Sequence, residues 1–291
     1  MRYERINQLR QSYPVAAMCR VLDVSESGYH AWSKRGPSPR AIANARLEVE
    51  IKAAHERTRH TYGPERLQAD LADHGVLVSV SRIKRIRKKL GLRCKQKRKF
   101  RVTTDSKHSL PIAPNLLNRE FAVSSPNKAW VTDITYIPTD EGWLYLAGIK
   151  DLFNGELVGH AFSSRMTQDL VATALFRAVA AKRPGHGLIH HSDRGGQYCA
   201  KQYQKSLRQF GMISSMSRKG DCWDNAPMES CWGLLKTELV FHQRFATREE
   251  AKRVISEYIE IFYNRIRKQA RLGYLSPAAF TQQFYKNQMA A

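Results

Sequence analysis

Cysteine is scarce in this chain of 291 residues, and its five cysteines form no recognisable pattern. They are odd in number and include no C-x-x-C pair, which argues against both a disulfide framework and a zinc module. Long apolar runs are also missing, since no stretch of about 18 residues could span a bilayer. The N-terminal residues are polar and mixed in charge, so no secretory signal is visible. These absences predict a reduced, cytoplasmic protein with no membrane segment.

Acidic residues are few relative to basic ones. The chain has 26 Asp and Glu against 48 Lys and Arg, a formal net charge of +22 and a pI near 10.0. Solubility alone does not require such an imbalance, which indicates a polyanionic partner, with nucleic acid as the first candidate. An anionic membrane surface would also attract this charge, but no spanning segment supports that alternative. The length and 42% hydrophobic content allow one large domain with one or two small ones.

The positive charge is concentrated in the first part of the chain. Residues 1–110 contain 25 Lys and Arg against 10 Asp and Glu, whereas residues 111–291 contain 23 against 16. Residues 82–101 alone hold 12 basic residues and no acidic one. Ile83, Ile86 and Leu90 recur at helical spacing, which predicts a helix with one apolar stripe and an otherwise basic surface.

A helix-turn-helix unit is predicted around this basic helix. The upstream helix begins near Pro64 and ends at His74-Gly75, and Ser79 or Ser81 can cap the basic helix. A longer amphipathic helix from about 41 to 57 precedes both, which gives three helices. Any small helical bundle shows similar periodicity. The basic residues on the last helix favour the helix-turn-helix interpretation, because that charge suits phosphate contact.

The first 40 residues contain a weaker pattern of two short helices, at 15–22 and 26–34, and both a helix-turn-helix and a simple helical hairpin remain open for them. Pro and scattered polar residues after residue 101 predict a connector. The predicted division is therefore 1–40 N-terminal helices, 41–101 helix-turn-helix domain, 102–125 linker and 126–291 catalytic core with C-terminal helices.

Beyond the linker the pattern changes to strands and then alternates. Asn154-Gly155 separates two strand-like runs and is a strong hairpin signal. The predicted strands are 130–137, 143–150, 156–163, 187–192 and 212–217, and the predicted helices are 167–183, 199–210, 227–240 and 247–264. Three antiparallel strands followed by strand-helix alternation predict an α/β core with a mixed five-stranded sheet and flanking helices.

Three acidic residues stand where such a core would bring them together. Asp133 lies within a strand-like run, Asp193 ends another, and Glu229 follows Pro227 at the start of a helix, with 35 residues between Asp193 and Glu229. Three carboxylates from two strands and a helix can hold two divalent cations, an arrangement that suits phosphoryl transfer. The chain offers no convincing protein nucleophile, and this mechanism needs none.

Each carboxylate also has an ordinary structural interpretation. An Asp at a strand end is often a turn residue, and a Glu in a first helical turn often complements the helix dipole. Their combination with Gly195-Gly196 and with the basic first half favours the metal site. His190 and His191 suggest a histidine-containing metal site less well, because alternating strand residues point to opposite faces and one of them is expected in the core.

Four stretches of the chain resemble the OrfB-type transposases of the insertion-sequence-three family, within the DDE transposase and retroviral integrase superfamily. The matching stretches are residues 130–136, 191–198, 217–230 and 262–277. The resemblance covers nearly the whole chain. It implies an RNase H-like catalytic core in which Asp133, Asp193 and Glu229 bind two Mg²⁺ ions, with Mn²⁺ able to substitute.

The resemblance also implies the reaction and the partners. Such an enzyme binds the terminal inverted repeats of its element, cleaves their 3′ ends and joins them to target DNA, as a homo-oligomer on paired ends at the bacterial nucleoid. An upstream frame, OrfA, usually contributes a zipper through a fusion, and this chain without heptads resembles the second frame alone. One departure is Lys268-Gln269 after Arg267, where the family usually has His-Ser.

The resemblance carries over Lys236 as well, seven residues after Glu229 and thus on the same helix face, where it can touch a DNA phosphate. The residues expected to contact DNA are Lys236, Arg82, Lys84, Arg85, Arg87, Lys88, Lys89, Lys97, Arg98, Lys99, Arg101, Arg194 and Arg267. Two rival functions are an RNase H-like nuclease without strand transfer and a non-catalytic DNA-binding repressor.

Several aromatic and acidic residues near the triad have two open roles. Asp221 and Asp224 are expected to order the loop before the helix of Glu229, and Asp224 could equally be only the cap of that helix. Trp223 and Tyr198 could stack on a splayed base or pack in the core.

Overall fold

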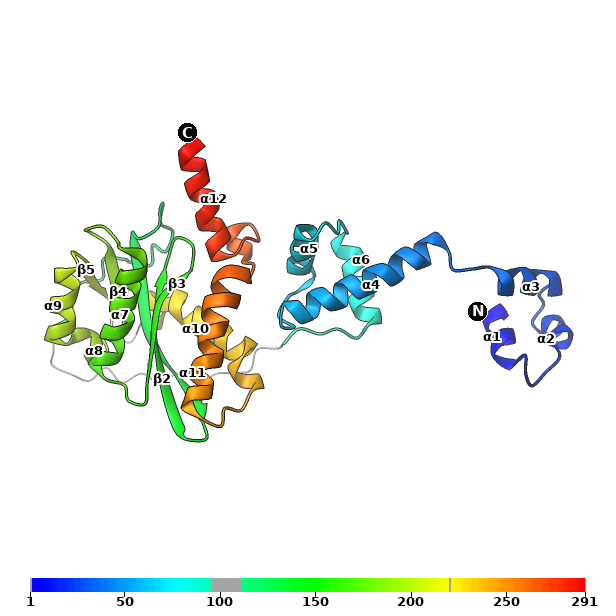
Figure 1. Cartoon of the computed structure of the whole chain (residues 1–291), viewed down its shortest axis with the longest axis horizontal. Helices are drawn as coiled ribbons and strands as arrows, with labels where there is room; N and C mark the ends of the chain where they lie inside the picture. Colours follow the sequence, from blue (N-terminus) through cyan, green and yellow to red (C-terminus); the bar gives the residue numbers. More distant parts are fainter. Residues whose placement is uncertain (1, 96–110, 220, 291) are drawn as a thin grey trace. The chain divides into compact units, whose positions relative to one another are not determined.

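The computed structural model describes residues 2–95, 111–219 and 221–290, without the side chain of Cys222. The chain divides into two compact units, Met1–Ala53 and Ala54–Ala291, and each is described by itself (Figure 1). The predicted contacts at Lys97, Arg98, Lys99 and Arg101 lie outside the described residues, as does the first part of the predicted linker, 102–110. The predicted domain boundaries stay predictions.

The first unit consists of short helices around a small core of Ile6, Cys19 and Tyr29. Its helices are α1 (Arg2–Leu9), α2 (Val15–Val21), α3 (Glu26–Lys34) and the first part of α4 (Pro39–Arg57). The Ser25 side chain accepts a hydrogen bond from the Gly28 amide and so caps α3. α2 and α3 match the predicted helices, whereas α1 was not predicted, because its sequence is mostly polar and Ile6 is its one buried residue.

Two helices of the second unit form the later part of the predicted helix-turn-helix. They are α5 (Pro64–Asp73) and α6 (Val80–Lys89). Gly63 is the N-cap of α5 with proline at the first helical position, and the Ser79 side chain accepts a hydrogen bond from the Arg82 amide to cap α6. Ile83 and Ile86 are buried, as their spacing predicts, and the basic side chains occupy the rest of the α6 surface.

A mixed five-stranded sheet organises the remainder of the second unit, as predicted. Its strands are β1 (Ala129–Thr139), β2 (Gly142–Asp151), β3 (Leu157–Ser163), β4 (Ile189–Ser192) and β5 (Ile213–Met216), in the order β3-β2-β1-β4-β5. The first three strands are antiparallel, and β4 and β5 run parallel to β1. Asn154-Gly155 does mark the β2–β3 connection, with Gly155 at φ +73° in a loop of five residues.

Helices cover both faces of this sheet. The helices that follow the first three strands are α7 (Gln168–Lys182), α8 (Gly196–Cys199), α9 (Lys201–Gln209) and α10 (Ala226–Glu238). A Cβ on Gly159 would lie 2.5 Å from the Ala174 carbonyl of α7, and a Cβ on Gly148 would lie 2.5 Å from the Trp232 ring of α10. Gly148 and Gly159 face opposite sides of the sheet in the β2–β3 register, so both helices approach the backbone closely.

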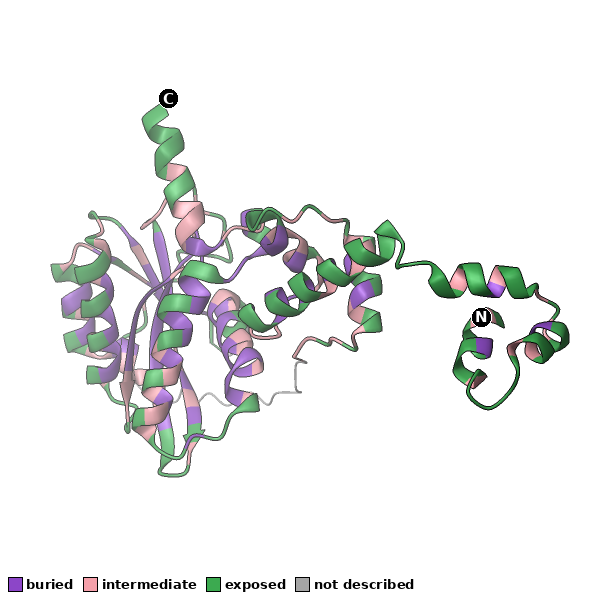
Figure 2. Ribbon diagram, turned by 45° about the vertical axis from the view of Figure 1, so that its right-hand side comes forward, coloured by how far each residue is buried: buried purple, intermediate pink, exposed green. Residues whose placement is uncertain are grey.

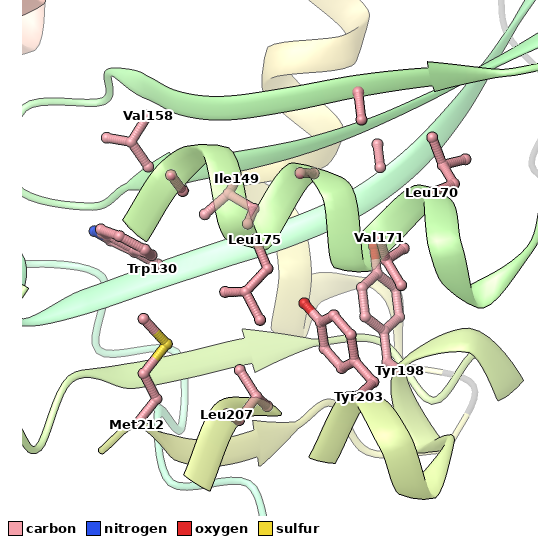
Figure 3. Packing of buried hydrophobic residues seen from close by; sticks show 14 of the residues in the cluster. Trp130, Ile149, Val158, Leu170, Val171, Leu175, Tyr198, Tyr203, Leu207 and Met212 are labelled. Carbon is pink, nitrogen blue, oxygen red and sulfur yellow. The ribbon is translucent and has the colours of Figure 1, made fainter. Parts of the chain in front are cut away.

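The main core lies between the sheet and α7 to α9. Trp130 and Ile149 from the sheet pack with Leu175 of α7 and Tyr203 of α9 (Figure 3). Figure 2 shows buried residues along the strands and exposed residues on the outer helix surfaces. Among the described residues, no helix combines the length and apolar character needed to cross a membrane.

The C-terminal helices differ from the prediction in two respects, because the helix predicted at 247–264 is only partly α-helical and the final helix, α12 (Pro277–Ala290), was not predicted. The predicted helix 247–264 is α-helical only as α11 (Arg248–Glu257) and continues as a π-helix, η3 (Tyr258–Ile266). The wider turn buries Tyr258, Ile259, Phe262, Tyr263 and Asn264. The remaining elements are the 3₁₀ turns η1 (Cys222–Asn225), η2 (Val240–His242) and η4 (Ala270–Leu272), and the helix α12 (Pro277–Ala290).

Candidate active site

Asp133 lies in β1, and Asp193 directly follows the adjacent strand β4 at the same level of the sheet. β1 and β4 are parallel and pair Val131 with His191, and each aspartate comes two residues after this pair. Asp133 lies opposite Gly148 of β2, and Gly148 faces Trp232 of α10. Because residues directly opposite each other share a face, Asp133 faces α10, the helix that carries Glu229.

The three carboxylates influence one another electrostatically. Burial raises the pKa of Asp133 well above its usual range, and the negative charges of Asp193 and Glu229 raise it further. Lys236 and the Ile134 amide act in the opposite direction. Glu229 is exposed as a residue, but partial burial of its carboxyl raises its pKa as well. Asp193 and Glu229 therefore lie near enough to Asp133 for their negative charges to disfavour its ionised form.

The donor chemistry of this place fits a hard divalent cation. Carboxylate oxygens are the ligands that Mg²⁺ prefers, and a cation would offset the repulsion that raises the pKa of Asp133. Among the residues that the structure describes, no three His, Cys, Asp or Glu side chains already stand as a metal-binding group.

The loop after β4 holds Asp193 in place. The Gly195 amide donates a hydrogen bond of 2.8 Å to Oδ1 of Asp193, and the Ser192 hydroxyl donates to the Asp193 carbonyl. Arg194 donates from Nε to the Ser217 carbonyl at 2.5 Å, so this predicted DNA contact is half-buried and engaged with the chain after β5. The Gly-rich turn thus fixes the direction of the aspartate.

Two side chains attach the start of α10 to the sheet. Asn225 donates from Nδ2 to the Thr132 carbonyl at 3.0 Å, immediately before Asp133. Lys150 of β2 donates from Nζ to the Pro227 carbonyl at 2.9 Å. Because Glu229 lies in the first turn of α10, these two bonds determine where its carboxyl enters the site.

The Lys236 side chain is more deeply buried than a residue that contacts DNA from the protein surface. Its residue is 6% exposed, and its Nζ lies 4.7 Å from the centre of the Tyr136 ring. Burial lowers the pKa of Lys236, and the charge of Asp133 opposes that change. Glu229 and Lys236 both act on Asp133, so they share a face of α10, as their spacing predicts. The ammonium group thus belongs to the carboxylate site.

Six of the predicted DNA contacts lie on α6. Arg85 and Lys88 are exposed, whereas Arg87 is half-buried and donates to Sγ of Cys94 at 3.1 Å. Lys84 is exposed and forms an ion pair of 3.4 Å with Glu65. The six residues are Arg82, Lys84, Arg85, Arg87, Lys88 and Lys89. α6 therefore presents a largely basic surface.

Arg267 is instead inside the protein. It is 1% exposed, and its Nε and Nη2 donate to the Glu238 carboxylate at 2.6 to 3.1 Å. The Tyr258 hydroxyl donates to the same carboxylate at 2.7 Å. This buried group connects the end of α10 to the C-terminal motif. Next to it, Lys268 forms an ion pair with Asp73, and the Lys268 amide donates to the Tyr62 hydroxyl at 2.6 Å.

The sequence did not predict the roles of two charged residues at the site. Lys150 and Glu238 look like ordinary charged residues of a strand and a helix, and their partners are distant in the chain. The structure also places the two aspartates whose roles were left open in the sequence. Asp221 caps η1 by accepting from the Trp223 amide, whereas Asp224 is completely buried and does not cap α10.

The aromatic and imidazole rings near the triad are divided between the core and the surface. Tyr198 is 1% exposed and Trp223 is 68% exposed. Both His190 and His191 are buried, where only one was expected in the core. His190 contacts the Tyr203 hydroxyl, and His191 contacts hydroxyls of the β5 segment. Both imidazoles are therefore held by the protein interior.

Comparison with protein families gives three matches along the chain. Residues 123–222 and 229–284 each match an integrase core domain, and residues 42–100 match a helix-turn-helix-like domain. Together with the observed sheet order, the integrase core matches confirm the predicted RNase H-like catalytic fold, and the helix-turn-helix-like match confirms the preceding helix-turn-helix region.

Proteins of two insertion elements match almost the whole chain. The chain is 58% identical to an uncharacterised 31 kDa protein of insertion element IS600 from Shigella sonnei, over 94% of this chain and 100% of that protein. It is 39% identical to the transposase InsF of insertion sequence IS3A from Escherichia coli strain K12, over 96% of this chain and 98% of the relative. A solved HTLV-2 integrase catalytic core with magnesium is 14% identical, with a TM-score of 0.43, over 54% of this chain and 97% of that one.

The sequence identity of these relatives, and the share of the chain that they cover, decide the family. They confirm the resemblance that the sequence motifs predict, and with it the enzyme class of a DDE transposase. The chain belongs to the family of the InsF transposases of insertion sequence IS3.

Proposed function

We propose that this protein is a DNA transposase that binds the terminal inverted repeats of its element, cleaves the 3′ ends and joins them to target DNA. The observation that carries this proposal is the convergence of Asp133 and Asp193, from adjacent parallel strands, with Glu229 of α10. Cleavage and joining are both in-line displacements at phosphorus, so one set of carboxylates serves both steps.

Asp133, Asp193 and Glu229 would hold two Mg²⁺ ions, with Mn²⁺ able to substitute. When bound, the ions supply Lewis-acid activation of the attacking oxygen and charge stabilisation at the leaving oxygen. The chain contributes the geometry. The Gly195 amide orients Asp193, and the bonds of Asn225 and Lys150 to the backbone orient the helix of Glu229.

Lys236 would touch the phosphate that reacts. Its position beside Asp133 places a positive charge within the carboxylate site, where the negative charge of a phosphodiester must be accommodated. Trp223, exposed in the turn before α10, offers a flat surface on which a base next to the cleaved bond can stack.

The basic surface of α6 would supply most of the sequence-independent affinity for DNA. Each Lys or Arg that neutralises a phosphate releases counterions, so binding through this helix weakens as salt rises. The reaction requires two element ends, which favours a homo-oligomer on paired ends. An OrfA-type partner or fusion would add a further DNA-binding part, and the DNA substrate places the reaction at the bacterial nucleoid in the cytoplasm.

Incubation with labelled element ends and Mg²⁺ tests the proposal. The wild type should release 3′-OH ends and then join them to a target duplex. Asp193→Asn should abolish both products, because a neutral amide is a poor ligand for Mg²⁺, while binding to the ends persists. Asp169→Asn, in the first turn of α7, removes one carboxylate outside the triad and serves as the matched control.

The two rival functions predict different products in this experiment. A nuclease without strand transfer would cut the ends but leave pre-cleaved 3′-OH ends unjoined. A repressor would bind the ends and cut nothing at any concentration of Mg²⁺ or Mn²⁺. Equal cleavage by Asp193→Asn and the wild type would contradict the metal mechanism.

A further inference from the structure

A basic cavity lies beside α10, and its lining includes neither the three carboxylates nor Lys236. Its volume is about 570 Å³, and it is formed by α10, the end of β2, the chain near Phe121, and the C-terminal motif. Its cationic lining residues are Arg66, Lys150, Arg267 and Arg271, and its lining includes no carboxylate. A cavity of this size is in the range of small-ligand sites and exceeds what one phosphate fills.

The positive charge of the cavity is only partly balanced. Arg267 is paired with Glu238. Among the described residues, Arg66, Lys150 and Arg271 form no ion pair with a carboxylate. Burial lowers the pKa of Lys150, and the charges of Arg271 and Arg267 lower it further. Unbalanced cations held this close together are expected where an anion binds.

The departure from the family motif lies in this lining. Gln269, where the family usually has a serine, is 8% exposed, and its Oε1 accepts a hydrogen bond from Nε of Arg271 at 3.3 Å. Its Nε2 is buried and has no hydrogen-bond partner among the described residues. A buried donor without an acceptor is unfavourable. An anionic oxygen in the cavity is the acceptor that this amide and the neighbouring cations share.

The cavity also has apolar walls. Phe121, Leu152 and Leu234 line it, and none of them can bind an anion. They suit the sugar and base that are attached to a phosphate. The combination of a cationic group and apolar walls therefore fits a whole nucleotide better than an inorganic ion.

We propose that this cavity binds one nucleotide unit, with its phosphate held by Arg271, Lys150 and the Gln269 amide. The nucleotide is either part of a DNA strand or free in solution. Binding of a DNA strand rests on the proposed function, whereas binding of a free nucleotide does not. In the strand case, the cavity would hold DNA on α10, the helix that carries Glu229, without taking part in the chemistry.

Binding by the full-length chain in EDTA tests this inference without requiring cleavage. The probes are a short single-stranded oligothymidylate without terminal phosphate, followed by fluorescence anisotropy, and dTMP, followed by calorimetry. Arg271→Gln should weaken binding of the true ligand by about tenfold, the loss of one charge-assisted contact. For the oligonucleotide, the slope of log affinity against log salt should fall by about 1.

Two further variants separate the effect of the cavity on binding from the general effect of net charge. Gln269→Glu adds a carboxylate to the cavity and should weaken binding at least as much as Arg271→Gln. Arg208→Gln on α9 makes the same change in net charge outside the cavity and should alter affinity less than about twofold. Unchanged melting temperatures show that each variant is folded.

The outcomes distinguish the two sources of nucleotide. Weakened oligonucleotide binding with no dTMP binding assigns the cavity to a DNA strand, and dTMP binding that depends on Arg271 assigns it to a free nucleotide. Equal effects of Arg271→Gln and Arg208→Gln, or no effect of Arg271→Gln on either probe, would overturn the inference. Metal-dependent cleavage of element ends that is lost only in Asp193→Asn would then leave the proposed function intact.

Discussion

The guanidinium of Arg218 donates two hydrogen bonds to the carboxylate of Asp224, from Nε to Oδ2 at 3.0 Å and from Nη2 to Oδ1 at 2.8 Å. Asp224 is completely buried, and it also accepts from Nε of Arg119 at 2.8 Å and from the side-chain Nδ2 of Asn115 at 3.0 Å. These bonds hold the pKa of Asp224 well below its usual range, with the Arg218 bond as the largest cause. The carboxylate therefore ties the chain before β1 to the turn that leads into α10.

Asp224→Asn should destabilise the protein by about 2 kcal/mol, because a neutral amide leaves two guanidinium groups without their shared charge. The start of α10 should also lose order, so cleavage of element ends should fall more steeply than DNA binding. Urea denaturation and cleavage rates measure the two effects. Asp221→Asn is the matched control, since Asp221 is only partly buried, and it should cost less. Equal losses in both variants would show that the burial of Asp224 has no special role.

Acid should weaken the fold through His190. Burial, with a smaller effect of the neighbouring His191, lowers the pKa of His190 to about 3. The unfolded chain binds this proton near pH 6.5, so between about pH 6.5 and 3 the unfolded state binds more protons, and stability falls as the pH falls, by up to about 1.4 kcal/mol per pH unit. Urea titrations from pH 7 to pH 5 should show this slope.

The variant His190→Phe isolates that contribution. Phenylalanine keeps a ring against Tyr203 but cannot bind a proton, so the dependence of stability on pH should become shallower. His242→Phe makes the same substitution at an exposed position and is the matched control. The expectation fails if both variants retain the wild-type slope.

Asp133→Asn should stabilise the metal-free protein by about 1 kcal/mol, because it removes a half-buried charge that the charges of Asp193 and Glu229 disfavour. The same variant should lose the rise in melting temperature that Mg²⁺ gives the wild type, since a bound ion stabilises only the folded state. Thermal melts with EDTA and with Mg²⁺ measure both. A variant that is less stable without metal, yet still responds to Mg²⁺, would place the ion elsewhere.

Lys236→Met should lower the rate of end cleavage by at least about tenfold while DNA affinity changes by less than about threefold. The reason is position: the ammonium is buried beside Asp133 and Tyr136, so it acts at the carboxylate site rather than on the general surface. Single-turnover cleavage and anisotropy separate the two quantities. Lys205→Met, on the exposed surface of α9, is the control and should leave both unchanged. Parallel losses of affinity and rate would make Lys236 an ordinary DNA contact.

Local patterns in the sequence predicted most of the secondary structure. Ser79 caps α6, Pro64 begins α5, Asn154-Gly155 marks a hairpin, and the five strands lie within a few residues of their predicted places. These features depend on backbone preferences and on the spacing of apolar residues, which are present in any short window of sequence. The π-helix at 258–266 was not predictable in this way, because α-helical and π-helical turns share the same residue types.

The candidate site also combines features that the sequence predicted with features that it did not predict. The sequence by itself determined the family, the mixed sheet and the three carboxylates proposed as metal ligands, because short motifs and periodicity carry that information. Only the tertiary structure decided that Lys236 is buried, that Arg267 pairs with Glu238, that Asp224 joins Arg119, and that a basic cavity lies beside α10. These outcomes depend on side chains from distant parts of the chain meeting at one place, and no local pattern records which pairs will meet.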